Sequence, residues 1–128
     1  MSDASRQRIL VVEDDPAVRN LVTTALDLHG YDVEKAETGE LAVMEAASRN
    51  PDLIMLDLGL PDIDGVEVIS KVRGWSAVPI IVISARTEDS DKIGALDAGA
   101  DDYLTKPFSV EASTFDNGPL HIDFAAGC

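Results

Sequence analysis

The sequence predicts an α/β fold in which helices cover both faces of one five-stranded parallel sheet. Five short apolar runs alternate with longer amphipathic stretches, and this alternation is typical of consecutive βαβ units. Ionisable and hydroxyl-bearing residues directly follow several of these runs, and such positions meet at one edge of a parallel sheet. We therefore expect a doubly wound domain whose functional site lies at the carboxyl ends of the strands.

The predicted strands are short β-branched or aliphatic runs, which suit a buried sheet. They cover residues 9–12, 31–36, 53–56, 79–83 and 102–105. The helices between them are expected to begin after Asp15, Thr38 and Asp64 and at Asp89, and to end at Gly30, Asn50, Gly74 and Gly99. Each strand except the last is thus followed by a predicted helix.

Composition limits the classes of function. The chain has 128 residues, enough for one compact domain, and its 24 acidic and 10 basic residues give a net charge of -14. This charge argues against nonspecific binding to nucleic acid or to an anionic membrane. The only cysteine is Cys128, so no internal disulfide can form, and no apolar stretch is long enough for a signal peptide or a membrane span. We expect a cytoplasmic domain.

The residues that carry the chemistry follow four different strands. Glu13 and Asp14 follow the first strand, Asp57 the third, Ser84 the fourth and Lys106 the fifth. They converge on one crevice if the strand order is 2-1-3-4-5. Three carboxylates in a crevice repel one another unless a cation compensates, and Mg²⁺ suits oxygen ligands that leave room for phosphate. Each residue alone also fits an ordinary cap, turn or loop, but together they indicate phosphoryl transfer to a carboxylate.

Four segments resemble response-regulator receiver domains of two-component systems. They are residues 9–15 (ILVVEDD), 51–61 (PDLIMLDLGLP), 79–85 (PIIVISA) and 98–108 (AGADDYLTKPF). Within this family, residues 56–62 and 73–93 most resemble the winged-helix (OmpR/PhoB-type) transcription regulators, in particular those that control potassium-transport genes. The resemblance implies a flavodoxin-like (CheY-like) fold with strand order 2-1-3-4-5.

The resemblance also implies a role for each residue of the acidic crevice. Asp57 would accept a phosphoryl group from a sensor histidine kinase, with Mg²⁺ as the cofactor. Asp14 and Asp57 would bind the metal directly, Glu13 mainly through a water molecule, and Gly59 through its backbone carbonyl. Such a chain would be a phosphoacceptor signalling domain, which catalyses only its own phosphorylation and dephosphorylation.

Three further residues would sense the phosphoryl group, again by resemblance. Ser84 would donate a hydrogen bond to a phosphoryl oxygen and Lys106 would pair with the group, aimed by a cis peptide bond to Pro107. Tyr103 would turn inward when Ser84 moves. The resulting change of conformation would regulate transcription.

The chain departs from the family after Phe108. No amphipathic helix follows, so the usual fifth helix is expected to be missing, and residues 109–128 resemble the start of a winged-helix effector domain. We therefore divide the chain into a receiver domain, 1–108, and an atypical tail, 109–128, in which residues 120–124 alternate like a strand. DNA binding is then assigned to an effector domain not present in this chain. The uncovered sheet predicts self-association or a rearranged C-terminal segment.

Two other classes of function remain as alternatives. A phosphatase of the haloacid-dehalogenase type would use an Asp-x-Asp motif such as Asp62 and Asp64, but the first Asp should directly follow a strand. A flavodoxin-like FMN protein would share the topology, although Glu13 and Asp14 would repel the cofactor's phosphate. A yellow colour would reveal a bound flavin.

Overall fold

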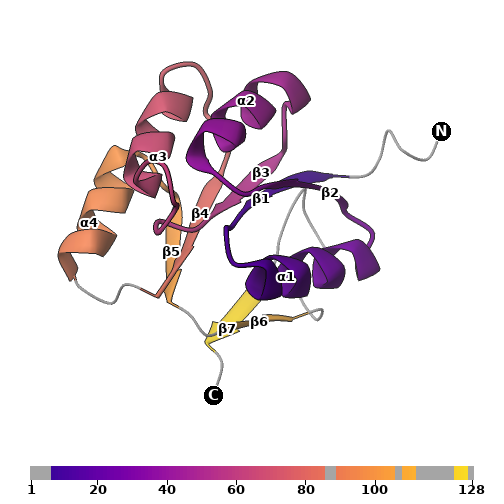
Figure 1. Cartoon of the computed structure of the whole chain (residues 1–128). Coiled ribbons are helices and arrows are strands. Elements are labelled where there is room, and N and C mark those ends of the chain that lie inside the picture. The colour runs from indigo at the N-terminus through magenta and orange to yellow at the C-terminus, as the bar shows by residue number, and fades with distance from the viewer. Residues whose placement is uncertain (1–6, 86–88, 106–107, 112–122, 127–128) are drawn as a thin grey trace.

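The computed structural model describes residues 7–85, 89–105, 108–111 and 123–126. Its main sheet consists of five parallel strands in the order β2-β1-β3-β4-β5, and a second sheet consists of β6 and β7, paired antiparallel (Figure 1). The strands are β1 (Arg8–Val12), β2 (Asp32–Ala36), β3 (Leu53–Leu56), β4 (Ile80–Ser84), β5 (Asp102–Thr105), β6 (Phe108–Glu111) and β7 (Asp123–Ala126). The predicted fold class and strand order are confirmed.

Three of the four described helices begin at the predicted caps. The side chains of Asp15, Thr38 and Asp64 accept hydrogen bonds from backbone N–H groups in the first turn of their helices, at 2.9, 3.1 and 2.9 Å. The helices are α1 (Pro16–Leu28), α2 (Gly39–Arg49), α3 (Gly65–Arg73) and α4 (Asp89–Ala98). None of these helices has the length and apolar character that would let it cross a membrane.

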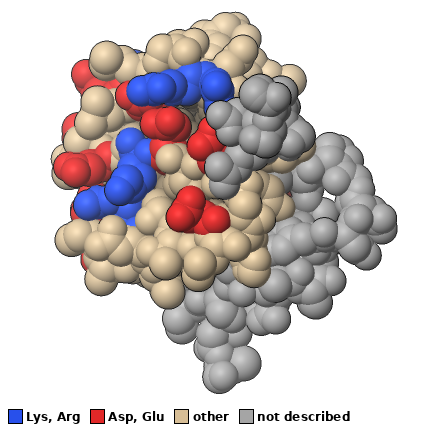
Figure 2. All heavy atoms as spheres, turned by 90° about the vertical axis from the view of Figure 1, so that its right-hand side faces the viewer, with Lys and Arg blue, Asp and Glu red and all other residues tan. Residues whose placement is uncertain are grey.

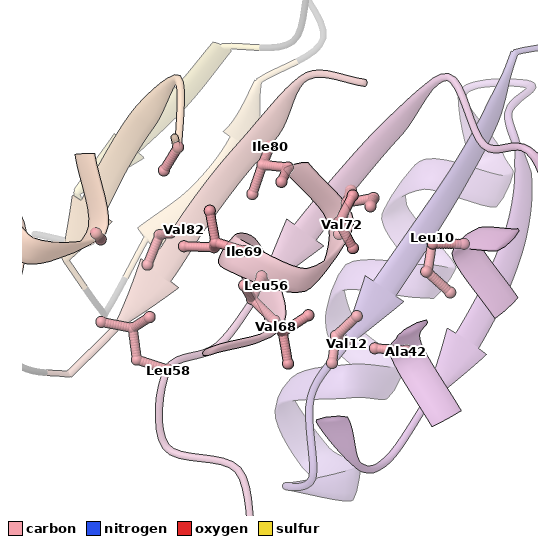
Figure 3. Packing of buried hydrophobic residues seen from close by; sticks show 14 of the residues in the cluster. Leu10, Val12, Ala42, Leu56, Leu58, Val68, Ile69, Val72, Ile80 and Val82 are labelled. Carbon is pink, nitrogen blue, oxygen red and sulfur yellow. The ribbon is translucent and has the colours of Figure 1, made fainter. Parts of the chain in front are cut away.

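The helices α2, α3 and α4 cover one face of the main sheet (Figure 1). Val68, Ile69 and Val72 of α3 point toward the strands and are almost completely buried (Figure 3). The strand residues of this cluster include Leu10, Val12, Leu56, Ile80 and Val82. Since these apolar positions alternate along each strand, they fix which face of the sheet carries the larger core.

On the opposite face of the main sheet lies α1, with the small β6–β7 sheet beside α1 and β5. Val22 and Leu26 of α1 pack against Ile9, Val11 and Met55 of the main sheet. β6 lies beside α1 and β7 beside β5 (Figure 1). The described residues after β5, 108–111 and 123–126, form strands and no helix.

The tail differs from the prediction in detail. The second strand of the small sheet covers Asp123–Ala126, and residues 120–122 of the predicted strand lie outside the described residues. Phe108–Glu111 forms a strand that the sequence did not indicate. The two segments pair along their whole lengths, from Phe108 with Ala126 to Glu111 with Asp123. This pairing joins segments more than ten residues apart, so a local pattern of alternation cannot reveal it.

Candidate metal and phosphoacceptor site

The first feature of the site is a group of three carboxylates at the ends of β1 and β3. These strands pair with Val12 opposite Leu56, and the N–H of Asp57 donates to the carbonyl of Val12 at 3.0 Å. Glu13, Asp14 and Asp57 each place one carboxylate oxygen within 4.8 Å of the others. Glu13 and Asp57 are buried, with 0% and 7% of their surface exposed, whereas Asp14 is exposed. The cluster is therefore open to solvent on the side of Asp14.

The loop between β1 and α1 is held in place by its own residues and by Arg19. The N–H of Glu13 donates to Ala36 of β2 at 3.0 Å, and its carboxylate accepts the N–H of Asp15 at 3.1 Å. The Arg19 guanidinium donates to the carbonyls of Glu13 and Asp14 at 3.0 and 3.4 Å. Sequence reasoning missed this residue, although Arg19 is the only basic residue of α1 and lies one turn from the acidic loop.

The loop between β3 and α3 carries the fourth predicted metal ligand, Gly59. Gly59 is exposed, and its N–H donates to Oδ1 of Asp57 at 3.3 Å. The buried Leu58 accepts hydrogen bonds from Leu60 and Gly65, both at 3.0 Å. Gly65 has no room for a side chain, because a Cβ there would lie 2.7 Å from the Leu58 Cα. The start of the loop is thus fixed against the start of α3, beside the carboxylates.

These residues fit a magnesium ion. Mg²⁺ takes oxygen ligands and is usually held by one or two carboxylates, with water and phosphate completing the shell. The cluster offers carboxylate oxygens and no nitrogen or sulfur, and the exposed Asp14 and Gly59 leave a side open to solvent. The donor set therefore suits Mg²⁺ better than zinc, which favours histidine and cysteine in structural sites.

Repulsion within the cluster gives a first prediction. Three carboxylates with oxygens this close destabilise the metal-free fold, so Asp14→Ala should raise the melting temperature in EDTA by about 3 °C. Thermal melts of the two proteins in EDTA and in excess Mg²⁺ provide the measurement. Excess Mg²⁺ should raise the melting temperature of the wild type more than that of the variant. An equal or lower midpoint for the variant in EDTA would contradict the prediction.

The structure places two of the predicted switch residues on neighbouring strands. Ser84 is the last residue of β4, opposite Thr105, rather than the first residue after the strand, and it is 1% exposed. Tyr103 of β5 lies opposite Val82 and is 8% exposed within the larger core. Since side chains alternate along a strand, Ser84 and Tyr103 lie on the same face of the sheet. Lys106 lies outside the described residues, as does Pro107 with its predicted cis bond.

The two aspartates of the phosphatase alternative hold helix starts instead. Asp64 caps α3, and Asp62 accepts the N–H groups of Gly39 and Glu40 at the start of α2, at 2.8 and 2.9 Å. The N–H groups of Glu40 and Gly39 lower the pKa of Asp62, because they favour the ionised carboxylate. The phosphatase alternative is not favoured. Sequence reasoning also missed the contact of Asp62 with α2, because its partners lie more than twenty residues away.

Acidic and basic side chains are mixed on the face of the molecule that Figure 2 shows. On the face that Figure 2 shows, the coloured basic side chains lie among acidic ones rather than in one broad basic patch. Arg49, for example, pairs with Glu45 at 3.2 Å and lies 3.8 Å from Glu34. This mixture of charges on the face shown contrasts with the clustered basic side chains that bind the phosphate backbone of nucleic acids.

Comparisons with known proteins give a consistent result. The response regulator receiver domain family matches residues 9–114. KdpE of Escherichia coli, a KDP operon transcriptional regulatory protein, is 61% identical over 102 residues, which cover 80% of this chain and 45% of that protein. KdpE of Staphylococcus aureus is 41% identical over an alignment of 140 positions, which covers 94% of this chain and 61% of that protein. The predicted similarity to this group of regulators is confirmed.

Solved structures agree with the sequence relatives. The BeF3-activated receiver domain of Klebsiella pneumoniae RstA is 36% identical and superposes with a TM-score of 0.75, covering 78% of this chain and 86% of that one. The chain spans about half the length of the curated relatives it matches. The acidic cluster at the ends of β1 and β3, the strand order and these matches lead to one conclusion: the chain belongs to the response regulator receiver domain family.

Proposed function

We propose that this chain accepts a phosphoryl group on Asp57 in the presence of Mg²⁺ and changes conformation as a result. The observation that carries the proposal is the grouping of Glu13, Asp14 and the buried Asp57 within 4.8 Å at the ends of two neighbouring strands. A structural cap or turn does not require three carboxylates with oxygens within 4.8 Å of one another, whereas a bound cation compensates their mutual repulsion and can also hold a phosphoryl oxygen. Membership of the receiver family supports the same assignment.

Each residue of the cluster has a distinct proposed task. Asp14, Asp57 and the carbonyl of Gly59 hold the metal directly, and Glu13 acts through a metal-bound water. When bound, Mg²⁺ supplies positive charge that neutralises the phosphoryl oxygens. A carboxylate oxygen of Asp57 attacks phosphorus, the bond from phosphorus to the donor's leaving atom breaks, and an aspartyl phosphate results.

The response to phosphorylation is proposed to run through β4 and β5. Ser84 donates its hydroxyl to a phosphoryl oxygen and Lys106 pairs with the same group. The position of Ser84 at the end of β4, on the same face as Tyr103, supports a coupled movement of the two side chains. Tyr103 then reports the phosphorylation state through its packing in the larger core.

The partners and the cellular role are proposed from the family. The phosphoryl donor is a sensor histidine kinase, and the output is regulation of transcription through a DNA-binding effector domain outside this sequence. We propose a cytoplasmic signalling domain that catalyses only its own phosphorylation and dephosphorylation. Self-association remains part of the proposal, since the described residues that follow β5 place strands, and no helix, beside α1 and β5.

Intact-mass spectrometry tests the proposed function. The chain is incubated with acetyl phosphate, once with Mg²⁺ and once with EDTA. We expect a gain of one phosphoryl group that depends on Mg²⁺ and is lost in mild base, where acyl phosphates hydrolyse. No gain with Mg²⁺, or an equal gain in EDTA, would refute the proposal. A yellow chain with a flavin spectrum would favour the FMN alternative.

A further inference from the structure

We propose that Asp62 is a positioning residue for the metal site. Its carboxylate attaches the β3–α3 loop to the start of α2, and the loop in turn presents the carbonyl of Gly59 to the metal. This inference rests on the proposed function and adds to it a residue that makes no contact with the metal or the phosphoryl group. Three contacts of the loop support it.

The first contact is a pair of charge-assisted hydrogen bonds. The two oxygens of Asp62 accept the N–H groups of Gly39 and Glu40 at 2.8 and 2.9 Å. Backbone N–H groups in the first turn of a helix have no partner within the helix, and the helix dipole favours a negative charge there. Each oxygen of the carboxylate thus serves one N–H group of α2, and the two bonds together fix both the position and the direction of the side chain.

The second contact is a close approach of the next residue, Ile63, to the same turn of α2. A Cβ at Gly39 would clash with the Ile63 side chain and would lie 3.0 Å from Val68 of α3. Ile63 is partly buried and packs against the larger core. The absence of a side chain at Gly39 therefore lets the loop lie directly on α2, where Asp62 reaches the N–H groups.

The third set of contacts attaches the two ends of the loop to β3 and α3. Leu58 is completely buried and its carbonyl binds the N–H of Gly65, while Asp64 caps α3. The loop is thus held at its ends by β3 and α3, and Asp62 with Ile63 holds its middle. Gly59 lies between Leu58 and Asp62 and is exposed, so the attachment at Asp62 limits the positions that its carbonyl can reach.

A capping role alone does not account for Asp62, because α2 already has a cap in its own sequence. The Thr38 hydroxyl accepts the N–H of Leu41 at 3.1 Å, and within the part of the chain that the structure describes it makes no hydrogen bond to the β3–α3 loop. Loss of either side chain removes hydrogen bonds from the same helix start, but only loss of Asp62 releases the loop. Thr38→Ala is therefore a matched control for Asp62→Ala.

The experiment compares the wild type with Asp62→Ala, Asp62→Asn and Thr38→Ala. Isothermal titration calorimetry measures the Kd for Mg²⁺, and hydrogen exchange measures the protection of the amides in residues 59–64 in EDTA. We expect Asp62→Ala to weaken Mg²⁺ binding about tenfold, the lower end of the range for residues that support metal ligands. The same variant should speed the exchange of the loop amides in the metal-free protein. Asp62→Asn retains one acceptor oxygen and should weaken binding only about threefold.

The control separates positioning from stability. Thr38→Ala should lower the melting temperature but keep the Kd for Mg²⁺ and the loop exchange at the wild-type values. Unchanged Mg²⁺ binding in both Asp62 variants, or equal weakening in Thr38→Ala, would overturn the inference. If Asp62→Ala does not fold, Asp62→Asn decides the question by the same two measurements. A wild type that binds no Mg²⁺ would refute the proposed function as well, so the two failures are distinguishable.

Discussion

Asp14→Asn should weaken Mg²⁺ binding by on the order of 100-fold, because it removes the charge of a proposed direct ligand. Glu13→Gln should weaken binding only about tenfold, since the proposed role of Glu13 is to hold a metal-bound water. The structure gives Glu13 a second task, because its carboxylate also accepts the N–H of Asp15. Glutamine preserves an acceptor for that bond. Calorimetric titration of Mg²⁺ into each variant measures the difference.

A neighbouring carboxylate provides the control for this prediction. Asp15 caps α1 with its side chain and is not among the three clustered carboxylates. Asp15→Asn removes the same charge within one residue of Asp14 and should leave the affinity for Mg²⁺ within about twofold. A greater loss in Glu13→Gln than in Asp14→Asn would contradict the assignment of direct and water-mediated ligands. An equal loss in Asp15→Asn would show that the effect is only one of net charge.

Removal of residues 113–128 should destabilise the chain and promote self-association. The deletion removes β7, so β6 loses its only strand partner in the small sheet that lies beside α1 and β5. Parallel sheets require cover on both faces, and exposure of a few hundred Å² of apolar surface costs several kcal/mol at about 25 cal/mol per Å². That is a large part of a typical stability of about 5 to 15 kcal/mol.

Two measurements check the truncation. Urea unfolding should show a lower midpoint for residues 1–112 than for the full chain, and light scattering should show a larger mean mass at equal concentration. The deletion also removes Cys128, so full-length Cys128→Ser is the reference that excludes an intermolecular disulfide. A truncated chain with the midpoint and mass of this reference would show that the small sheet contributes no cover to the main sheet.

Local patterns in the sequence were sufficient to predict most strands of the main sheet and the helices that cover it. Asp15, Thr38 and Asp64 begin their helices as predicted, because an N-cap depends on residues only two or three positions away. The clustering of Asp14 and Asp57 was also predictable, since residues that follow parallel strands share one edge of the sheet. The prediction was off by one residue at Ser84, which pairs with Thr105 and so extends β4.

Long-range contacts account for what the sequence did not reveal. Asp62 reads as an ordinary loop aspartate, and its role at the start of α2 depends on Gly39, more than twenty residues earlier. Arg19 reads as an exposed helix residue, although it donates to the carbonyls of the β1–α1 loop. The strand β6 exists through its pairing with β7 across an intervening segment. In each case the partner is set by the folded chain and not by a local pattern.

The most direct test of the proposed function is the site of phosphorylation. Wild type, Asp57→Asn and Asp62→Asn are incubated with Mg²⁺ and acetyl phosphate, and intact mass is followed over time. The account predicts one phosphoryl group on the wild type, slower labelling of Asp62→Asn at limiting Mg²⁺, and no labelling of Asp57→Asn, whose fold is verified by circular dichroism. A folded Asp57→Asn chain that gains a phosphoryl group at the wild-type rate would contradict the account.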